Sequence, residues 1–228
     1  MLIGTIVNTA TVILGSLIGM SLGNILPERL RDTVMKGLGM CTMFIGVTGM
    51  LGGKNALITI ISIAVGAAMG ELLDLDGRLS RFAGKLEKKF QKPGEKTSLA
   101  EGFVTASLVF CVGTMTIVGA LNDGLSGNHE MLFTKAVLDF VSSMIFASSL
   151  GIGVLLAAGA VFLIQGSIAC LASFVAPLLQ QGNTIEEMTV VGSVLILGLG
   201  LNLIGVSTLK VMNYVPAIFL PILLCLFM

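Results

Sequence analysis

Long apolar runs, each of roughly 20 residues, alternate along the chain with short polar connections. An α-helix of that length can cross the hydrocarbon core of a bilayer. Transmembrane β-strands are shorter and alternate apolar with polar positions, so continuous runs favour helices. The pattern predicts an all-α integral membrane protein of about eight transmembrane helices, over residues 2–22, 34–52, 56–73, 101–122, 132–156, 160–179, 189–209 and 214–228.

The long polar stretch 74–98 predicts the orientation of these helices. Its basic residues are interleaved with Leu and Phe at helical spacing, which is typical of an amphipathic helix lying on an anionic membrane surface. Loops rich in Lys and Arg remain in the cytoplasm. Alternation of the spans then places every basic residue except Lys54 and Lys135 inside, and both termini outside.

Composition excludes several classes of protein. Hydrophobic residues make up 55% of the chain and charged residues only 11%, with a mean hydropathy of +1.00. Soluble domains have roughly a quarter of their residues charged. The formal net charge is zero, so nucleic-acid binding has no electrostatic support. The expected partners are the lipid bilayer and a small ion or solute. No metal or cofactor is predicted, and a homo-oligomer is left open.

An internal repeat relates the two ends of the chain. Residues 23–48 and 182–207 share eight identical positions of 26 at an offset of 159. The first matched loop is basic and predicted inside, whereas the second is acidic and predicted outside. Helices 1–3 would therefore repeat as helices 6–8 with inverted topology, as in many secondary transporters. The predicted units are residues 1–73, 74–98, 99–156 and 157–228.

The fourth and fifth predicted helices form a central pair. They carry similar motifs, SLVFC at Ser107–Cys111 and SMIFA at Ser143–Ala147. The motifs place Phe110 and Phe146 near the midpoint of each span. The two helices are predicted to run antiparallel about a pseudo-twofold axis at the membrane midplane.

A candidate site for an ion or solute lies near the midplane, between helices 4 and 5. Hydroxyl groups, and carbonyls exposed at glycine, can bind a desolvated cation or a small polar solute. The alternative is that small residues only permit close packing, with Ser and Thr bonded to their own helices. The candidate residues are Asp139, Ser107, Cys111, Thr114, Ser143, Ser148, Ser149, Gly151 and Asp123.

Asp139 is the most specific candidate, because it lies about 10 Å along its helix at 1.5 Å per residue. A carboxylate inside a membrane is a functional candidate by default. The alternatives are a structural pair with Lys135, a proton or cation site, and a helix end that faces water. Asp123 is interpreted either as a group that caps a vestibule or recruits cations, or as part of a turn with Gly124.

Two further interpretations concern polar residues near helices. His129 is expected to be alone and solvated in its loop. Asn8 and Asn202 are expected to form hydrogen bonds between helices, with lining of a pore as the alternative.

Four stretches resemble a known family. They are Ile3–Thr9, Lys135–Asp139, Phe146–Val154 and Gln165–Ser167. Together they are similar to the YqgA/YdfK-type bacterial membrane proteins, a family that carries a domain of unknown function. The resemblance covers nearly the whole chain and implies the bacterial inner membrane. It implies little about activity.

A transporter or channel for a small ion or polar solute is the predicted function. A non-transporting structural or accessory membrane protein is the alternative. An enzyme is not expected, because the single His lies in a loop and no GxSxG or HExxH motif is present.

Overall fold

The computed structural model of the protein describes all residues except 1, 24–26, 82–98, 113, 180–181 and 228. Most of the described residues are helical, and none of them forms a strand. The elements are α1 (Ile3–Gly23), α2 (Glu28–Met50), α3 (Ala56–Leu72), α5 (Leu99–Cys111), α6 (Thr114–Ser126), α7 (Glu130–Leu150), α8 (Ile152–Cys170), α9 (Ala172–Leu179), α10 (Thr184–Leu203), the 3-10 helix η1 (Val211–Phe219) and α11 (Leu220–Leu224).

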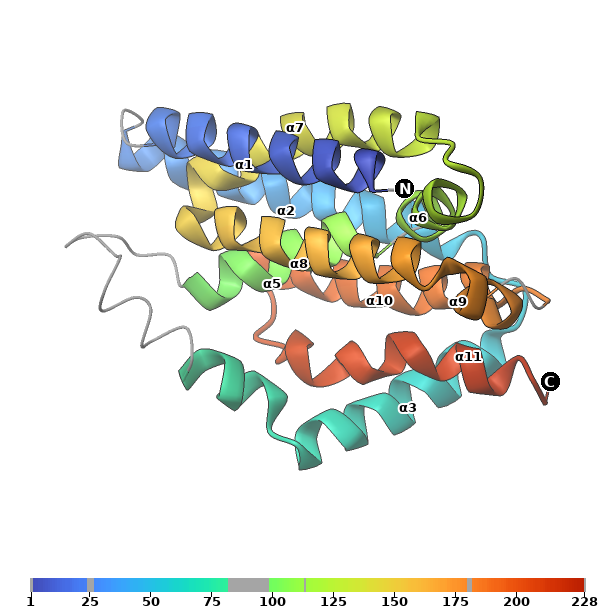
Figure 1. Ribbon diagram of the computed structural model, residues 1–228. Helices are drawn as coiled ribbons and strands as arrows, with labels where there is room; N and C mark the ends of the chain where they lie inside the picture. The colour runs from blue at the N-terminus through green and yellow to red at the C-terminus, as the bar shows by residue number, and fades with distance from the viewer. Residues whose placement is uncertain (1, 24–26, 82–98, 113, 180–181, 228) are drawn as a thin grey trace.

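The long helices lie side by side, and the N and C termini lie at the same end of the bundle (Figure 1). We call this the terminal end, and it also holds the connection from α6 to α7. The opposite end holds the turn from α7 to α8 at Gly151, and we call it the Gly151 end. The end of α3 and the start of α5 lie there too (Figure 1).

Glycines at the helix contacts define the direction of each packed pair. Gly4 packs on Leu132 and Gly23 packs on Ser148, so α1 and α7 run parallel. In α2, Gly39 packs on Ile204 and Gly53, just beyond the helix, packs on Val190, so α2 and α10 run antiparallel. A residue without a side chain lets two backbones approach closely, which is how helices associate in lipid.

The pair of α3 and η1 also runs antiparallel. Gly66 packs on Ala217, and Gly70 packs on the backbone of Asn213. A buried carboxylate connects the other end of α3 to α10. Glu187 accepts hydrogen bonds from the backbone N–H groups of Lys54 (2.8 Å) and Asn55 (2.9 Å), and Asn55 is the N-cap residue of α3.

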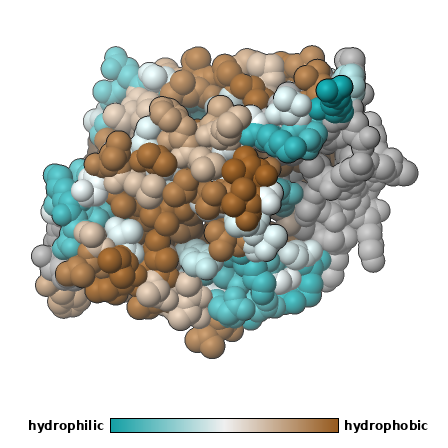
Figure 2. Space-filling view, turned by 180° about the vertical axis from the view of Figure 1, so that it is seen from behind, coloured by the Kyte–Doolittle hydropathy of each residue, from teal (hydrophilic) through white to brown (hydrophobic). Residues whose placement is uncertain are grey.

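Length and composition make several helices candidates for crossing a membrane. Four described helices are long and apolar enough, namely α1, α7, α8 and α10. The number becomes six if each of two bent pairs forms one span. Large apolar side chains such as Phe44 and Leu57 are exposed, and Figure 2 shows apolar residues across the middle of one face. So much exposed apolar surface is typical of a protein surrounded by lipid.

The fourth predicted span, residues 101–122, is broken. Helix α5 ends at Cys111, and the helix that follows is inclined to it by 60°. The hydroxyl of Thr116 donates to the carbonyl oxygen of Phe110 across the break, at 2.9 Å. This bond supplies a partner to a carbonyl that the interrupted helix no longer satisfies.

The predicted limit of the fifth span at residue 156 is wrong. Helix α7 ends at Leu150 and α8 begins at Ile152, so residue 156 lies inside α8. The chain turns at Gly151, which has φ 68° and ψ −147°. Residues with a side chain rarely adopt this conformation. The predicted boundary between units at 156/157 therefore does not coincide with a helix end.

The remaining predicted segments differ in detail. Residues 160–179 form the second half of α8 and then α9, with a break at Leu171. The last segment is the 3-10 helix η1, which contains Pro216, followed by α11. Residues 75–81 are helical, and the rest of the predicted amphipathic segment, 82–98, lies outside the described residues.

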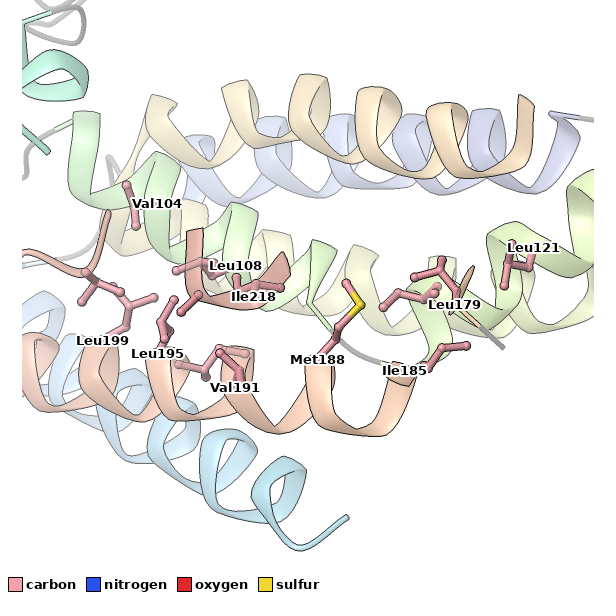
Figure 3. Packing of buried hydrophobic residues seen from close by; sticks show 14 of the residues in the cluster. Val104, Leu108, Leu121, Leu179, Ile185, Met188, Val191, Leu195, Leu199 and Ile218 are labelled. Atoms are coloured by element: carbon pink, nitrogen blue, oxygen red, sulfur yellow. The ribbon is translucent and has the colours of Figure 1, made fainter. Parts of the chain in front are cut away.

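Two apolar clusters form the interior. The larger one joins α5, α6 and α9 to α10 and η1, and Figure 3 shows Leu108, Val191 and Ile218 within it. The second joins α1, α5, α7 and α8. In the second cluster the rings of Phe110 and Phe146 meet edge to face, with centroids 6.2 Å apart. The two aromatic positions of the central motifs are thus in direct contact.

Candidate functional site

A buried ion pair lies in the terminal half of α7. The Nζ atom of Lys135 lies 2.8 Å from Oδ1 and 2.7 Å from Oδ2 of Asp139. Only 6% of Lys135 and 5% of Asp139 are exposed. The i, i+4 spacing brings both side chains to one face of the helix, against α1 and α8. The predicted pairing is therefore formed, and Asp139 does not face water.

Two amides from neighbouring helices complete a polar cluster around this pair. Asn8 of α1 donates to Oδ2 of Asp139 at 3.0 Å and to Oε1 of Gln165 of α8 at 3.3 Å. Asn8 and Gln165 are fully buried. The prediction that Asn8 forms hydrogen bonds between helices is confirmed. We call Asn8, Lys135, Asp139 and Gln165 the polar cluster.

The polar cluster retains unused hydrogen-bonding capacity. Among the described residues, Oδ1 of Asn8 and Nε2 of Gln165 have no hydrogen-bond partner. Oγ1 of Thr5, one turn before Asn8 on α1, is also buried without a partner. A buried polar atom without a partner costs about 1–3 kcal/mol. The arrangement therefore offers both a donor and acceptors to a polar guest.

Another buried carboxylate, that of Asp123, lies between this cluster and the terminal end. Asp123 of α6 is fully buried, and its Oδ1 lies 2.8 Å from Nδ1 of His129. Its Oδ2 has no hydrogen-bond partner and approaches Gly4 of α1. Two predictions are corrected here. Asp123 belongs to a helix rather than a turn with Gly124, because α6 continues to Ser126, and His129 is paired rather than alone.

Two other predicted residues line a cavity at mid-depth. The cavity has a volume of about 250 Å³ and lies between α5, α8, α10 and η1. Ser107 and Cys111 line it among mostly apolar side chains. Cys111 also belongs to the second apolar cluster, together with Val12 of α1 and Phe146 of α7.

The structure does not gather the remaining predicted residues into one site. Ser143 packs against Gly15 of α1 and donates to the carbonyl of Phe140. Ser148 donates to the carbonyl of Ile145, and both Ser148 and Ser149 are buried near the Gly151 end. The hydroxyls of Ser143 and Ser148 therefore bond to their own helix, as expected if these small residues serve only close helix packing. Gly151 forms the turn between helices, away from mid-depth.

Thr114 and Asn202 were also predicted to take part in polar contacts. Thr114 is the first residue of α6, and its side chain lies outside the described part of the structure. Asn202 bonds Ser207 and the backbone of Leu209 just beyond its own helix, so the prediction that it connects helices is wrong. The described residues contain no group of three or more His, Cys, Asp or Glu that could hold a metal ion.

Gln165 was not among the predicted site residues, although it completes the cluster. Its signal in the sequence is a single amide within a long apolar run, the same signal that singled out Asn8. A lone polar residue in such a run needs a partner from another helix. The sequence could not show that Asn8 would bond both Asp139 and Gln165.

Long apolar helices that enclose a charged pair define a helical membrane protein. A family model matches residues 3–226, and the chain belongs to that family, described as Protein of unknown function (DUF554). The chain is 33% identical to the uncharacterized membrane protein YdfK of Bacillus subtilis (strain 168), with 96% of this chain and 93% of YdfK covered. It is 30% identical to the uncharacterized protein YqgA of Escherichia coli (strain K12), with 96% and 94% covered. No solved structure matches the chain.

Proposed function

We propose that this protein is a transporter or channel for a small ion or small polar solute, which passes beside the polar cluster. The observation that carries the proposal is the buried Lys135–Asp139 pair within helices long and apolar enough to span a membrane. Charged side chains inside a membrane are costly and typically mark ion or solute pathways. The unpartnered atoms of Asn8 and Gln165 support the proposal, because a polar guest could bond to them.

Polar groups occur at successive depths between the two ends of the bundle, which supports a path through it. Glu101 and Thr105 line a cavity near the Gly151 end. Ser107 and Cys111 line the mid-depth cavity. The polar cluster and then the Asp123–His129 pair follow toward the terminal end. A solute on this path would exchange one set of polar contacts for the next.

We further propose eight spans with an inverted repeat. The four long spans and two bent pairs would be joined by two shorter apolar helices, Gly39–Met50 and Val211–Leu224. A shift of the chain by 159 residues aligns α2 with α10, and α3 with η1 and α11. Both matched pairs pack antiparallel, as a twofold axis in the membrane plane requires. The contact between Phe110 and Phe146 fits the same axis.

The proposed location is the bacterial inner membrane, with both termini outside. In a variant without native cysteines, Cys at position 130 should react with an impermeant maleimide added to intact cells. Cys at position 78 should react only after permeabilisation. Glu130 and Arg78 are both exposed, at the terminal end and the Gly151 end respectively. The reverse pattern would contradict the orientation, and labelling of both from one side would contradict the arrangement of spans.

Transport itself is tested by flux into proteoliposomes across a panel of cations, anions and amino acids. The wild type should move at least one solute of the panel. Asp139→Asn should reduce that flux roughly 30-fold or more, which corresponds to about 2 kcal/mol less stabilisation of the solute as it passes the polar cluster. Asp32→Asn is the matched control, since Asp32 also forms an i, i+4 pair with a lysine but at the surface. A wild type that moves no solute would contradict the proposal.

The second candidate is a non-transporting structural or accessory protein. The favouring observation is that Lys135 and Asp139 neutralise each other, as a purely structural pair would. In that case Asp139→Asn would lower stability and change no flux.

A further inference from the structure

Two cavities adjoin along α5. The first has a volume of about 220 Å³ and lies at the Gly151 end, between α5, the end of α10 and the start of η1. The second is the mid-depth cavity of about 250 Å³. Val104 and Met212 line both cavities, so the two spaces meet at these side chains. A single elongated molecule could therefore occupy both.

The first cavity is acidic. Asp76 and Glu101 line it together with Ser80 and Thr105, and none of the described Lys or Arg residues does. Among the described residues, no hydrogen bond or ion pair engages either side-chain carboxylate, and the nearby cations Arg81 and Lys210 pair with Asp74 and Glu71 instead. Within the described part of the chain, these two carboxylates are thus negative charges without a paired cation at the Gly151 end of the cavity.

A buried hydroxyl gives the first cavity a second polar feature. Thr105 is fully buried, and its Oγ1 has no hydrogen-bond partner in the described part of the chain. A hydroxyl can accept a hydrogen bond from a guest or orient its dipole toward a cation. Cavity, carboxylates and unused hydroxyl together make a site that is complementary to a positively charged group.

The second cavity has the opposite character. Apolar side chains such as Phe103, Leu108, Ile164 and Phe219 surround it, and its only polar contributors among the described residues are Ser107, Cys111 and Thr189. Most of its wall therefore suits an apolar group, which leaves no polar atom unpaired there. At about 30 Å³ for each water-sized group, the cavity has room for roughly eight methylene groups.

We propose that the two cavities form one binding site for an organic cation with an apolar tail. The cationic head lies between Asp76 and Glu101, near Thr105. The tail passes Val104 and Met212 and fills the mid-depth cavity. This goes beyond the proposed transport function, because the binding site exists whether or not the bound molecule crosses the membrane. It also does not involve the polar cluster.

Equilibrium binding of radiolabelled decyltrimethylammonium to the purified protein in lipid nanodiscs tests this site. Binding should be saturable. Three competitors each differ in one feature: tetramethylammonium lacks the tail, decanol lacks the charge, and decyl phosphate carries the opposite charge. Each should compete at least about tenfold less well, since 1.4 kcal/mol corresponds to a factor of ten.

Two sets of variants test the binding of the cationic head and of the apolar tail separately. Asp76→Asn with Glu101→Gln should weaken binding about tenfold, while the Glu130→Gln control at the other end leaves it unchanged. Ala160→Leu should weaken binding by a similar factor, because Ala160 lines the mid-depth cavity. Gly159→Leu is its control, because a side chain there meets open space.

The proposal is overturned if decanol or decyl phosphate competes as well as the cation. That result would indicate a site for any acyl chain, such as a lipid tail. It is also overturned if neutralising the two carboxylates or filling the cavity leaves the affinity unchanged. The single variant Glu101→Gln provides the measurement if the double variant does not fold, and it should still weaken binding. Because binding alone is measured, failure here leaves the flux result for Asp139→Asn unaffected.

Discussion

Lys135→Met should lower the free energy of unfolding by about 3–5 kcal/mol, because it leaves the Asp139 carboxylate buried without its counter-ion. Among the described residues, Lys135 contributes two of the three hydrogen bonds that reach this carboxylate, and the third comes from Asn8. A titration with sodium dodecyl sulfate in mixed micelles, followed by circular dichroism, would measure the loss.

Two comparisons make this expectation specific. Lys36→Met removes the same type of side chain from a surface i, i+4 pair with Asp32 and should cost less than about 1 kcal/mol. The double replacement Lys135→Met with Asp139→Leu should recover most of the lost stability, because no unpaired charge remains. If Lys135→Met lowers the free energy of unfolding no more than Lys36→Met does, the Lys135–Asp139 pair is not buried as the structure shows.

Gly19→Ala should destabilise the protein by about 1–3 kcal/mol, because a side chain at this position overpacks a helix contact. A Cβ atom on Gly19 would collide with the carbonyl oxygen of Met144, and a backbone atom of α7 cannot rotate away. The contact between α1 and α7 would have to open, and Asn8 and Asp139 lie on the same two helices. The same micelle titration measures the change.

Gly37→Ala is the matched control for this effect. Gly37 also lies inside a helix, α2, but a Cβ atom there meets nothing within 4 Å. The helix propensity of Ala should leave stability unchanged or raise it by up to about 1 kcal/mol. Equal losses at positions 19 and 37 would show that the close approach of α1 and α7 does not limit stability.

The apolar runs were sufficient to predict an all-helical membrane protein, because the thickness of the bilayer alone sets how long and continuous a spanning helix must be. The helix ends were harder to predict. At Gly151 the chain turns without a polar residue, because a positive φ angle makes the turn there and no loop is needed. The break after Cys111 was also hidden, since the Thr116 hydroxyl that satisfies the freed carbonyl looks like any other hydroxyl in the sequence.

Asp139 could be identified as a candidate because a carboxylate in an apolar run is unusual on its own. Its partner Asn8 of α1, and Gln165 of α8 that Asn8 also bonds, could not be identified, because partner choice depends on how distant helices pack. The serines of α7 illustrate the opposite case. Their residue type suited a polar site, but Ser143 and Ser148 bond the carbonyls of their own helix. Residue type alone does not distinguish these two uses of a hydroxyl.

The central claim is that the Lys135–Asp139 pair serves the passage of a solute and does more than hold the helices together. The most direct test measures flux by the double variant Lys135→Met with Asp139→Leu in proteoliposomes, with the solute that the wild type moves. This variant should be folded and nearly as stable as the wild type, so a loss of flux cannot come from unfolding. We expect its flux to fall to the level of empty liposomes. Flux equal to that of the wild type would contradict the account, because the pair would then be only structural.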